Sequence, residues 1–493
     1  MELALKIFQF VLSISILVVL HELGHFLPAR WFRTRAEKFF LFFDPWFSIF
    51  SMKKIKGSWK FKFFSKNLPD TKVIEVNGEK KEVPIDLDEL SDDDWRKYPE
   101  NTKYGIGWLP MGGYVKIAGM VDESMDIEQL KKPAQSWEFR SKPAWQRLII
   151  MLGGVTVNFF LAWFIFSALV FKNGESIFDS SKITEPLKYS TAAKKMGFHD
   201  GDEILTVDGK VQPNFRKLAL DVLLSDHVTV LRDGKEVTFQ TNDEGKAEAF
   251  QSPDPRGFLS PRINPVMDTI MYESTLKAGL KQGDIVAKID GKEIEFNDEL
   301  APLVRPKAGK TVDLQVLRNG NPVDLTIPVK EDGTIGVLPY KQLLKYETHK
   351  DYSFGQSVTR GFTQTIESLT YQIKSFKLVF NKKVKGYKNV SGPIGIINQM
   401  PVSKDAHNNY SIDWDAFWAF TAMFSIWLAF INLIPIPGLD GGHVIFTLWE
   451  MITGKPVPQK VLENAQMIGV IFLLGLMVLI FGNDIFKLIV GKF

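Results

Sequence analysis

Four long apolar segments interrupt an otherwise mixed pattern of hydrophobic and polar residues. Each is close to the roughly 20 residues that a helix needs to cross the hydrocarbon core of a bilayer. The pattern therefore predicts four transmembrane helices, at about residues 4–26, 148–172, 415–436 and 465–490. The alternative for the first segment is a signal peptide, because Lys6 precedes the apolar run, but no small-residue cleavage site follows it.

Basic residues in the short loops predict how these helices are oriented. One group flanks the loop between the first two spans, and a smaller group lies between the last two: Arg30, Arg33, Arg35, Lys142 and Arg147, then Lys455 and Lys460. Loops rich in lysine and arginine stay on the cytoplasmic side. Residues 174–412 and both termini are therefore expected on the opposite side.

The long segment between the second and third spans contains an internal repeat. The two copies share a Gly-Asp motif, an Asp-Gly pair and a second turn, in the pairs 195–204 and 277–286, 208–209 and 290–291, and 231–234 and 317–320. Each copy predicts a short helix that ends at glycine, followed by alternating strands such as Glu203–Val207 and Ile285–Ile289 that close in Asp-Gly turns. We expect two tandem, mainly β domains at 180–262 and 263–345.

The repeat resembles PDZ domains of the protease-associated, circularly permuted kind. PDZ folds bind extended peptides by adding a strand to a sheet edge, so peptide termini are expected partners. The alternative is that the two domains only cover an active site and bind no peptide.

The loop at 28–147 has three kinds of sequence. Residues 38–66 mix phenylalanine and tryptophan with lysine, a composition that favours the headgroup layer of a membrane. Residues 67–101 are polar and acidic and predict a solvated insertion. Residues 104–117 read as strands broken by glycines, which predicts a β-hairpin that dips toward the membrane and packs against helices or lines a wet cavity.

The predicted fold class is an α-helical membrane protein with four transmembrane helices, a membrane-associated β-hairpin or sheet, and two tandem PDZ-like domains between the second and third helices. The predicted parts are 1–27, 28–147, 148–173, 180–262, 263–345, 350–412, 413–440 and 463–493. The part at 350–412 contains an amphipathic helix or gate, because apolar residues recur on one helical face: Phe362, Ile366, Leu369, Ile373 and Phe376.

Composition limits the chemistry that the chain can perform. A net charge of +3 spread over 60 basic and 57 acidic residues argues against nucleic-acid binding. Because the chain has no cysteine, any bound metal must be held by histidine and carboxylate side chains. The 39 phenylalanines favour lipid-facing surface, with a phenylalanine-rich soluble core as the alternative.

The first apolar segment carries the motif His21-Glu22-Leu23-Gly24-His25. Two histidines four residues apart lie on one face of a helix and can bind Zn²⁺, with the intervening glutamate as the general base. Ionisable groups inside a membrane are costly, so the motif needs a purpose there. The alternative is an ion pair between Glu22 and one histidine.

A third metal ligand is expected from another span. Asp440 is the candidate, because it follows the third apolar segment, where Pro435, Pro437 and several glycines prevent a continuous helix. His443 is an alternative ligand. Asn432 is either a substrate contact or a partner for the backbone groups of the broken span.

The pairing of His21 to His25 in the first span with Asn432 to Asp440 in the third resembles the site-2 proteases. The resemblance extends to Gly107 to Gly113 before the second span, to the tandem PDZ-like domains, and to Ser391 to Gly395 before the third. It covers nearly the whole chain. One departure is the stretch at about 57–101, which interrupts the usual sheet before Tyr104.

The resemblance implies an intramembrane zinc metalloendopeptidase of a bacterial inner membrane, with its PDZ domains and both termini in the periplasm. His21, His25 and Asp440 would hold Zn²⁺ and Glu22 would be the base. Substrate would contact Asn432 and the segments that contain Gly107, Gly112, Gly113, Pro435 and Pro437.

The substrates that the family implies are single-span membrane proteins: an anti-sigma factor already trimmed by another protease in an envelope stress response, and remnant signal peptides. The PDZ pair would act as a size filter. Two other function classes remain open, a PDZ-bearing membrane scaffold without turnover and a metal transporter that uses the same ligands.

Overall fold

The computed structural model describes residues 1–68, 71–76, 79–120, 133–252, 257–338, 344–384, 386, 390–404 and 409–489. Parts of the predicted loop at 28–147, of the second repeat and of the C-terminal segment therefore lie outside the described residues. The chain forms two compact units. The first comprises 1–173, 352–372 and 390–493, and the second comprises 174–351 and 373–389.

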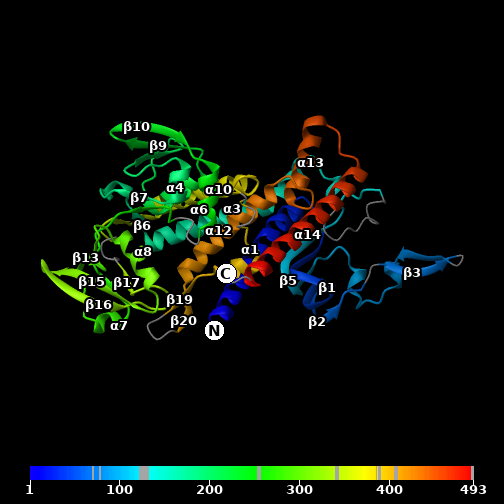
Figure 1. Cartoon of the computed structure of the whole chain (residues 1–493). Coiled ribbons are helices and arrows are strands. Elements are labelled where there is room, and N and C mark those ends of the chain that lie inside the picture. The colour runs from blue at the N-terminus through cyan, green and yellow to red at the C-terminus, as the bar shows by residue number, and fades with distance from the viewer. Residues whose placement is uncertain are drawn as a thin grey trace. The chain divides into compact units, whose positions relative to one another are not determined.

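Among the described residues, four helices of the first unit are long and apolar enough to cross a membrane, as the sequence predicts. They are α1 (Glu2–Trp31), α3 (Ala144–Asn173), α12 (Trp414–Leu433) and α14 (Gln459–Ile489). Helix α3 packs against both α1 and α12 (Figure 1). The α1 and α3 backbones approach closely, because a Cβ atom at Gly24 would lie 2.4 Å from the Gly153 carbonyl oxygen.

The third span is interrupted where the prolines and glycines predict a break. Helix α12 ends at Leu433, residues 434–439 are not helical, and α13 runs over Asp440–Thr453. Gly438 has φ +100°, a conformation that glycine adopts without strain. The break places Asp440 in the first turn of α13, which packs on α3.

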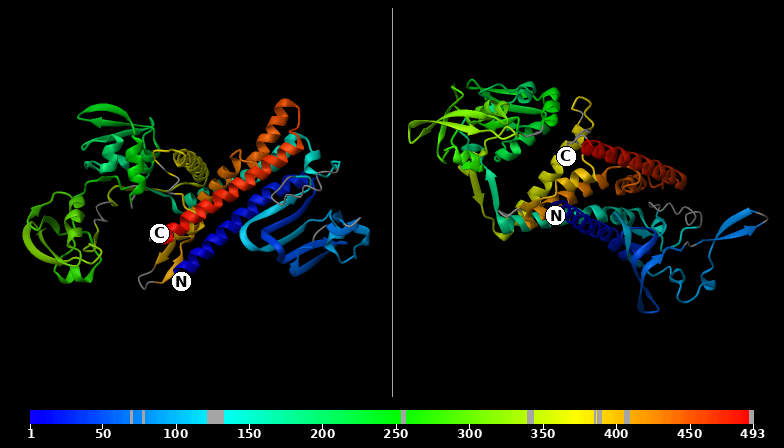
Figure 2. Two further views of the ribbon diagram at one scale, coloured as in Figure 1. Left: turned by 45° about the vertical axis from the view of Figure 1, so that its right-hand side comes forward. Right: turned by 60° about the horizontal axis from the view of Figure 1, so that its bottom comes forward.

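A bent sheet lies beside α1, made of β1 (Ala36–Ile55), β2 (Ser58–Lys66) and β5 (Lys103–Ile117) (Figure 2). The register places residues 103–106 of β5 between the two halves of β1, and residues 113–117 at the sheet edge. The predicted hairpin within 104–117 is therefore wrong. This segment is one long strand that pairs with β1. Both strands bend, so each half of β1 lies beside part of β5.

The insertion after β2 contains the hairpin β3 (Thr71–Val76) and β4 (Glu79–Pro84) and two short 3-10 helices, Leu87–Glu89 and Trp95–Lys97. Trp95 is buried, and the Lys53 ammonium donates a hydrogen bond to its carbonyl oxygen at 3.0 Å. This polar segment therefore packs on one face of the sheet and is not simply a solvated loop.

The second unit contains two small modules with separate apolar cores. The first has β7 (Leu187–Tyr189), α4 (Thr191–Met196), β8 (Glu203–Val207), α5 (Phe215–Leu224), β9 (His227–Arg232), β10 (Lys235–Gln240), α6 (Asp243–Gln251) and β11 (Leu259–Pro261). The second has β12 (Thr269–Ile270), α7 (Glu273–Lys277), β13 (Ile285–Ile289), β14 (Lys292–Glu293), α8 (Leu300–Val304), β15 (Thr311–Arg318), β16 (Asn321–Pro328) and β17 (Val337–Leu338). The predicted strands Glu203–Val207 and Ile285–Ile289 form as β8 and β13.

The same buried ion pair recurs in both modules. Asp202 and Asp284 are 2% and 1% exposed, and each accepts two hydrogen bonds from an arginine on a later strand, Arg232 or Arg318. The arginines also donate to the carbonyl groups of Gly197 and Gly279. The repeat in the sequence is therefore a repeat of structure down to individual hydrogen bonds.

Replacing Arg232 with methionine should lower the local unfolding free energy of the first module by about 3 kcal/mol, because it leaves a carboxylate buried without its partner. Burial disfavours ionised Asp202, but the Arg232 guanidinium and the His199 N–H hold the pKa of this carboxyl below its usual range. The stabilisation is therefore present above about pH 4 and is lost as the pH falls through the lower folded pKa.

Hydrogen exchange of the β8 and β9 amides in the full chain, measured between pH 3 and pH 7, would test this prediction. Lys195→Met, which removes only an exposed pair with Glu248, is the matched control and should change little. If Arg232→Met protected these amides as well as the parent does at neutral pH, the pair would not be stabilising.

The remaining elements connect or extend the two units. They are β6 (Glu175–Phe178) paired with β18 (Glu347–Lys350), α10 (Phe354–Val379), α11 (Pro393–Asn398), and β19 (Val402–Lys404) paired with β20 (Tyr410–Ile412). The predicted amphipathic helix forms as α10, and four of its five predicted apolar residues are well exposed: Phe362, Ile366, Ile373 and Phe376.

Candidate metal centre

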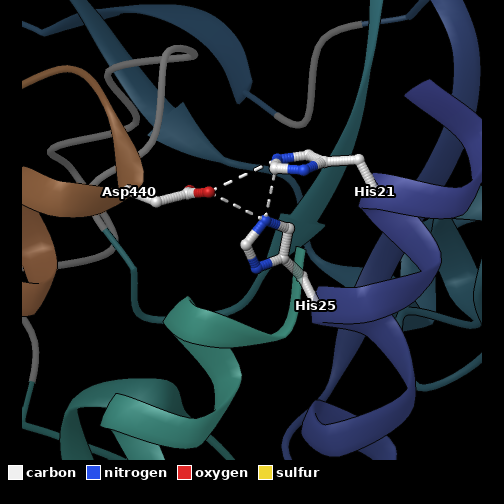
Figure 3. A group of neighbouring side chains, drawn as sticks. All are labelled: His21, His25 and Asp440. Atoms are coloured by element: carbon white, nitrogen blue, oxygen red, sulfur yellow. Dashed lines mark hydrogen bonds and ion pairs between the residues drawn. The ribbon is translucent and has the colours of Figure 1, made fainter. Parts of the chain in front are cut away.

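His21 and His25 project from one face of α1 toward Asp440 at the start of α13 (Figure 3). Both imidazoles are buried, and the break in the third span directs the Asp440 carboxylate toward them. The Oδ2 atom of Asp440 lies 3.3 Å from Nε2 of His21 and 3.3 Å from Nε2 of His25, and the two Nε2 atoms are 3.2 Å apart. Residues more than 400 positions apart in the chain thus meet at one point.

The spacing of these three atoms fits a metal ion. Ligands at about 2.0–2.1 Å from a tetrahedral zinc centre are about 3.3–3.4 Å from one another. Apart from the two imidazole nitrogens, buried Asp440 Oδ2 has no hydrogen-bond partner among the described residues, which is costly for a carboxylate oxygen unless a cation binds it. The donor set, two imidazoles and one carboxylate with no thiolate, is one that zinc accepts.

Backbone and side-chain groups hold both imidazoles in place. The Nδ1–H group of His25 donates a hydrogen bond to the Ile150 carbonyl oxygen at 2.8 Å, which leaves Nε2 free to bind a metal. Nδ1 of His21 lies 3.1 Å from the amide nitrogen of Asn158 on α3. Ser425 on α12 donates to the Asn158 carbonyl oxygen, so three helices meet around His21.

The Asn158 amide orients His21 better if its oxygen Oδ1 and nitrogen Nδ2 exchange positions. As placed, Oδ1 is buried without a partner among the described residues, whereas Nδ2 faces His21. The two atoms occupy equivalent positions, so their assignment follows from the hydrogen-bond network. With Oδ1 toward His21, the amide accepts the Nδ1–H hydrogen bond, its buried oxygen gains a partner, and Nε2 is available as a ligand.

We expect Asn158→Leu to weaken zinc binding by about 10- to 100-fold, the usual effect of removing a hydrogen-bond partner of a ligating histidine. Asn158→Asp should restore most of the affinity, because a carboxylate oxygen also accepts from Nδ1. Competition with a zinc chelator would measure both variants. Equal zinc affinity for Asn158→Leu and the parent would show that Asn158 does not orient His21.

Two glycines on α3 allow α1 to approach closely, and one of them, Gly154, makes room for the imidazoles. A Cβ atom at Gly154 would lie 2.5 Å from Nε2 of His25 and 2.6 Å from Cε1 of His21. A Cβ atom at Gly153 would lie 1.9 Å from the Gly24 carbonyl oxygen. The sequence prediction did not include Gly153, Gly154 or Asn158, although a Gly-Gly pair followed by asparagine one helical turn later in an apolar span is a visible signal.

A cleft of about 660 Å³ adjoins the three ligands, within the first unit. Its lining combines the histidines and Asp440 with Glu22, Asn432, His443 and a buried glutamine on α14, Gln466. Residues 112–117 of β5, at the edge of the sheet, line another side. The amide nitrogen of Asn432 lies 3.2 Å from Nε2 of His21. The Glu22 carboxylate, the three side chains that could hold a metal ion and a strand edge therefore share one cavity.

The predicted substrate-contact residues divide into two groups. Asn432, Gly112 and Gly113 line the cleft, whereas Gly107, Pro435 and Pro437 are not among its lining residues. Gly107 packs against β1, where a Cβ atom would lie 2.1 Å from the Phe43 carbonyl oxygen. The Pro437 carbonyl oxygen abuts Gly469 on α14. These residues shape the sheet and the helix break.

His443 lines the cleft but does not belong to the group of three described side chains that could hold a metal ion. It lies one turn after Asp440 on α13, so the structure brings it near the ligands without making it one of them. Glu22 also lines the cleft. In the sequence it lies between the two histidines, at the position where the motif predicts a general base.

Known proteins resemble this chain over nearly its whole length. The regulator of sigma-E protease RseP of Escherichia coli (strain K12) is 27% identical over 508 residues, which cover 97% of this chain and 98% of that protein. The regulator of sigma E protease of Haemophilus influenzae is 26% identical over 504 residues, with the same coverage. A Vibrio cholerae protein named "Putative zinc metalloprotease" is 27% identical over 506 residues, also with that coverage.

The sequence model of Peptidase family M50 matches residues 9–66 and 94–476. The matched segments include the α1 histidines, Glu22, Asn158 and Asp440, and they omit most of the insertion that carries β3 and β4. The site-2 protease resemblance seen in the motifs is thereby confirmed. The chain belongs to peptidase family M50.

Proposed function

We propose that the protein is an intramembrane zinc metalloendopeptidase that cuts transmembrane segments of single-span membrane proteins. The main support for this proposal is the position of the three proposed metal ligands. His21 and His25 lie on a helix that is long and apolar enough to cross a membrane, and Asp440 follows the break in another span. Buried ionisable groups in such segments mark functional sites.

His21, His25 and Asp440 would hold the zinc ion through two Nε2 atoms and Oδ2. Bound zinc supplies Lewis-acid activation of a water molecule and of the substrate carbonyl group. Ile150 and Asn158 keep the two imidazoles in the tautomer that ligates. The zinc assignment is supported by the ligand spacing and by the name of the Vibrio cholerae relative.

Glu22 is the general base in this proposal. It lies in the same cleft as the ligands and on the same helix, between the two histidines. Its carboxylate takes a proton from the water as the C–O bond forms at the carbonyl carbon, and then delivers this proton to the amine nitrogen as the peptide C–N bond breaks.

A helical substrate hides its carbonyl groups in hydrogen bonds, so the site must bind it in an extended form. Residues 113–117 of β5 lie at the edge of the sheet and line the cleft, where an unwound segment can add as a further strand. The Asn432 amide faces the same space. These features support substrate unwinding on the β5 edge.

The proposed location and substrates rest on the protein's membership of the family. We place the protein in a bacterial inner membrane with the second unit and both termini in the periplasm, as the basic loops favour. An anti-sigma factor and remnant signal peptides are the proposed substrates, and the name of the Escherichia coli relative supports the first. The two modules of the second unit would act as PDZ domains that exclude bulky substrates or bind peptide termini.

Trapping with the Glu22→Gln form tests the substrate class. The variant keeps the ligand set and lacks the base, so bound substrates should remain uncut and copurify from membranes. We expect single-span proteins and short apolar fragments in the trapped set, compared with a His21→Ala, His25→Ala control that lacks the metal site. If only soluble proteins were trapped, the proposal of intramembrane cleavage would be wrong.

A further inference from the structure

Helix α14 carries a single polar side chain in its apolar stretch. Between residues 465 and 482, Gln466 is the only residue that is neither apolar nor glycine. Gln466 is 6% exposed, whereas its neighbours Ile468, Ile471 and Phe472 are well exposed. The helix therefore turns its one amide inward and its apolar side chains outward. Because a buried polar group in a membrane span is costly, the position of this amide indicates a function.

The inward face of α14 packs on the break in the third span. A Cβ atom at Gly469 would lie 1.6 Å from the Pro437 carbonyl oxygen, and one at Gly438 would lie 3.1 Å from Cδ1 of Leu473. Gly469 and Leu473 follow Gln466 by three and seven residues, so all three lie on one face of the helix. Gln466 therefore lies one turn before the point where α14 contacts the segment that leads to the third proposed metal ligand.

The Gln466 amide lines the cleft and makes no side-chain hydrogen bond to the residues that the structure describes. The other two amides of the cleft lining are engaged. Asn67 donates to the carbonyl and carboxylate groups of Asp44, and the Asn432 nitrogen lies 3.2 Å from Nε2 of His21. A buried amide without a partner is unfavourable, so we expect the donors and the acceptor of Gln466 to meet a ligand that enters the cleft.

An extended substrate on the edge of β5 needs hydrogen-bond partners on its other edge as well. In a β-ladder the N–H and C=O groups of one residue point to the same side, and those of the next residue point to the opposite side. Pairing with residues 113–117 therefore satisfies only the groups that face β5. The hydrocarbon region offers no water to the remaining groups, and an unpaired backbone group there is costly. A side chain on a different wall of the cleft must supply a donor and an acceptor.

We propose that Gln466 binds the backbone of one substrate residue, on the edge of the extended segment that faces away from β5. Its Oε1 accepts a hydrogen bond from the substrate N–H group, and its Nε2 donates one to the carbonyl oxygen of the same residue. An amide suits this role because it combines donors with an acceptor and carries no charge. Helix α14 thereby forms the second wall of the substrate site. The inference rests on the proposed cleavage of extended segments in this cleft.

Substrates with a backbone ester test this contact. A single-span peptide would carry an ester in place of one amide, at each residue around the scissile bond in turn, which removes one N–H donor and leaves every side chain unchanged. Binding would be measured with the full-length, zinc-loaded Glu22→Gln form, with and without Gln466→Met. The protein would be reconstituted in phosphatidylethanolamine and phosphatidylglycerol vesicles, and energy transfer from its tryptophans to an acceptor on the peptide would report binding.

We expect Gln466→Met to weaken binding of the all-amide peptide about 10-fold, because it leaves substrate backbone groups without partners. At one position, the ester should weaken binding by a similar factor when Gln466 is present and have no further effect in Gln466→Met. Esters at the other positions should affect both forms equally. Gln459→Met is the matched control, because Gln459 lies on the same helix, hydrogen-bonds to Glu463 and is absent from the cleft lining. The control should bind every peptide as the Glu22→Gln form does.

Equal ester effects in both forms at every position would overturn the inference, because Gln466 would then contact no substrate N–H group. Unchanged binding of the all-amide peptide by Gln466→Met would also overturn it. Gln466→Leu replaces the methionine variant if that variant fails to fold. Cleavage of the all-amide peptide by the parent separates the two proposals: if the parent cuts the peptide, a negative ester result rejects only the Gln466 contact, whereas an uncut peptide rejects the proposed function.

Discussion

Glu22→Gln should lower the rate of cleavage of a membrane-embedded peptide by about 10²- to 10⁴-fold, the usual contribution of a general base, while zinc content stays unchanged. Glutamine has nearly the same shape as glutamate but cannot accept the proton from water. None of the three proposed ligands is altered, and Ile150 and Asn158 still orient the imidazoles.

Cleavage would be followed in vesicles that contain the purified protein and a single-span substrate, with zinc measured in the same samples. The control is Glu463→Gln, which changes a carboxylate of α14 that accepts a hydrogen bond from Gln459 and is absent from the cleft lining. Undiminished cleavage by Glu22→Gln would contradict the metalloprotease mechanism. A scaffold without turnover would show no cleavage even in the parent.

Gly154→Ala should weaken zinc binding by about 100-fold, with a parallel loss of cleavage. The added Cβ atom would lie 2.5 Å and 2.6 Å from atoms of the two ligating imidazoles, so both rings must move. Alanine is favoured over glycine in a helix by about 1 kcal/mol, so unfolding of α3 is not the expected cause.

Zinc titration of the purified variant checks this expectation. Gly475→Ala on α14 is the matched control, because a Cβ atom there meets nothing within 4 Å and the residue also lies in an apolar span. The control should bind zinc as the parent does. Parental zinc affinity in Gly154→Ala would show that α3 does not pack against the histidines in this way.

Much of the fold follows from local patterns in the sequence. The four spans depend on segment length and apolarity, and the helix break depends on the prolines and glycines before Asp440. The strands β8 and β13 follow from alternation bounded by Asp-Gly turns, at which Asp208 and Asp290 adopt positive φ. Such features need no knowledge of distant contacts.

The parts that the sequence did not reveal depend on distant partners. Alternation within 104–117 predicts strand structure, but the choice between a hairpin and one bent strand depends on β1, which lies about 60 residues earlier. Likewise, Asn158 and Gly154 matter because α3 packs on α1 at the level of the histidines. A single span gives no indication of which helix it contacts.

The candidate metal ligands could be predicted from the sequence, whereas fewer of the other residues that line the cleft could be. His21 and His25 follow from motif spacing, and Asp440 follows from the absence of cysteine and the need for a carboxylate in another span. Gly107, Pro435 and Pro437 are absent from the cleft lining, whereas Gln466 lines it unpredicted. Residue type alone does not separate side chains that shape a backbone from those that face a cavity.

The position of the scissile bond tests cleavage within the membrane most directly. The parent protein would be reconstituted in vesicles with a single-span substrate, and both product fragments would be identified by mass spectrometry, with the Glu22→Gln form as the blank. We expect a cut inside the apolar span of the substrate that is absent from the blank. Cleavage confined to the soluble flanks of the span would contradict an active site that works within the membrane.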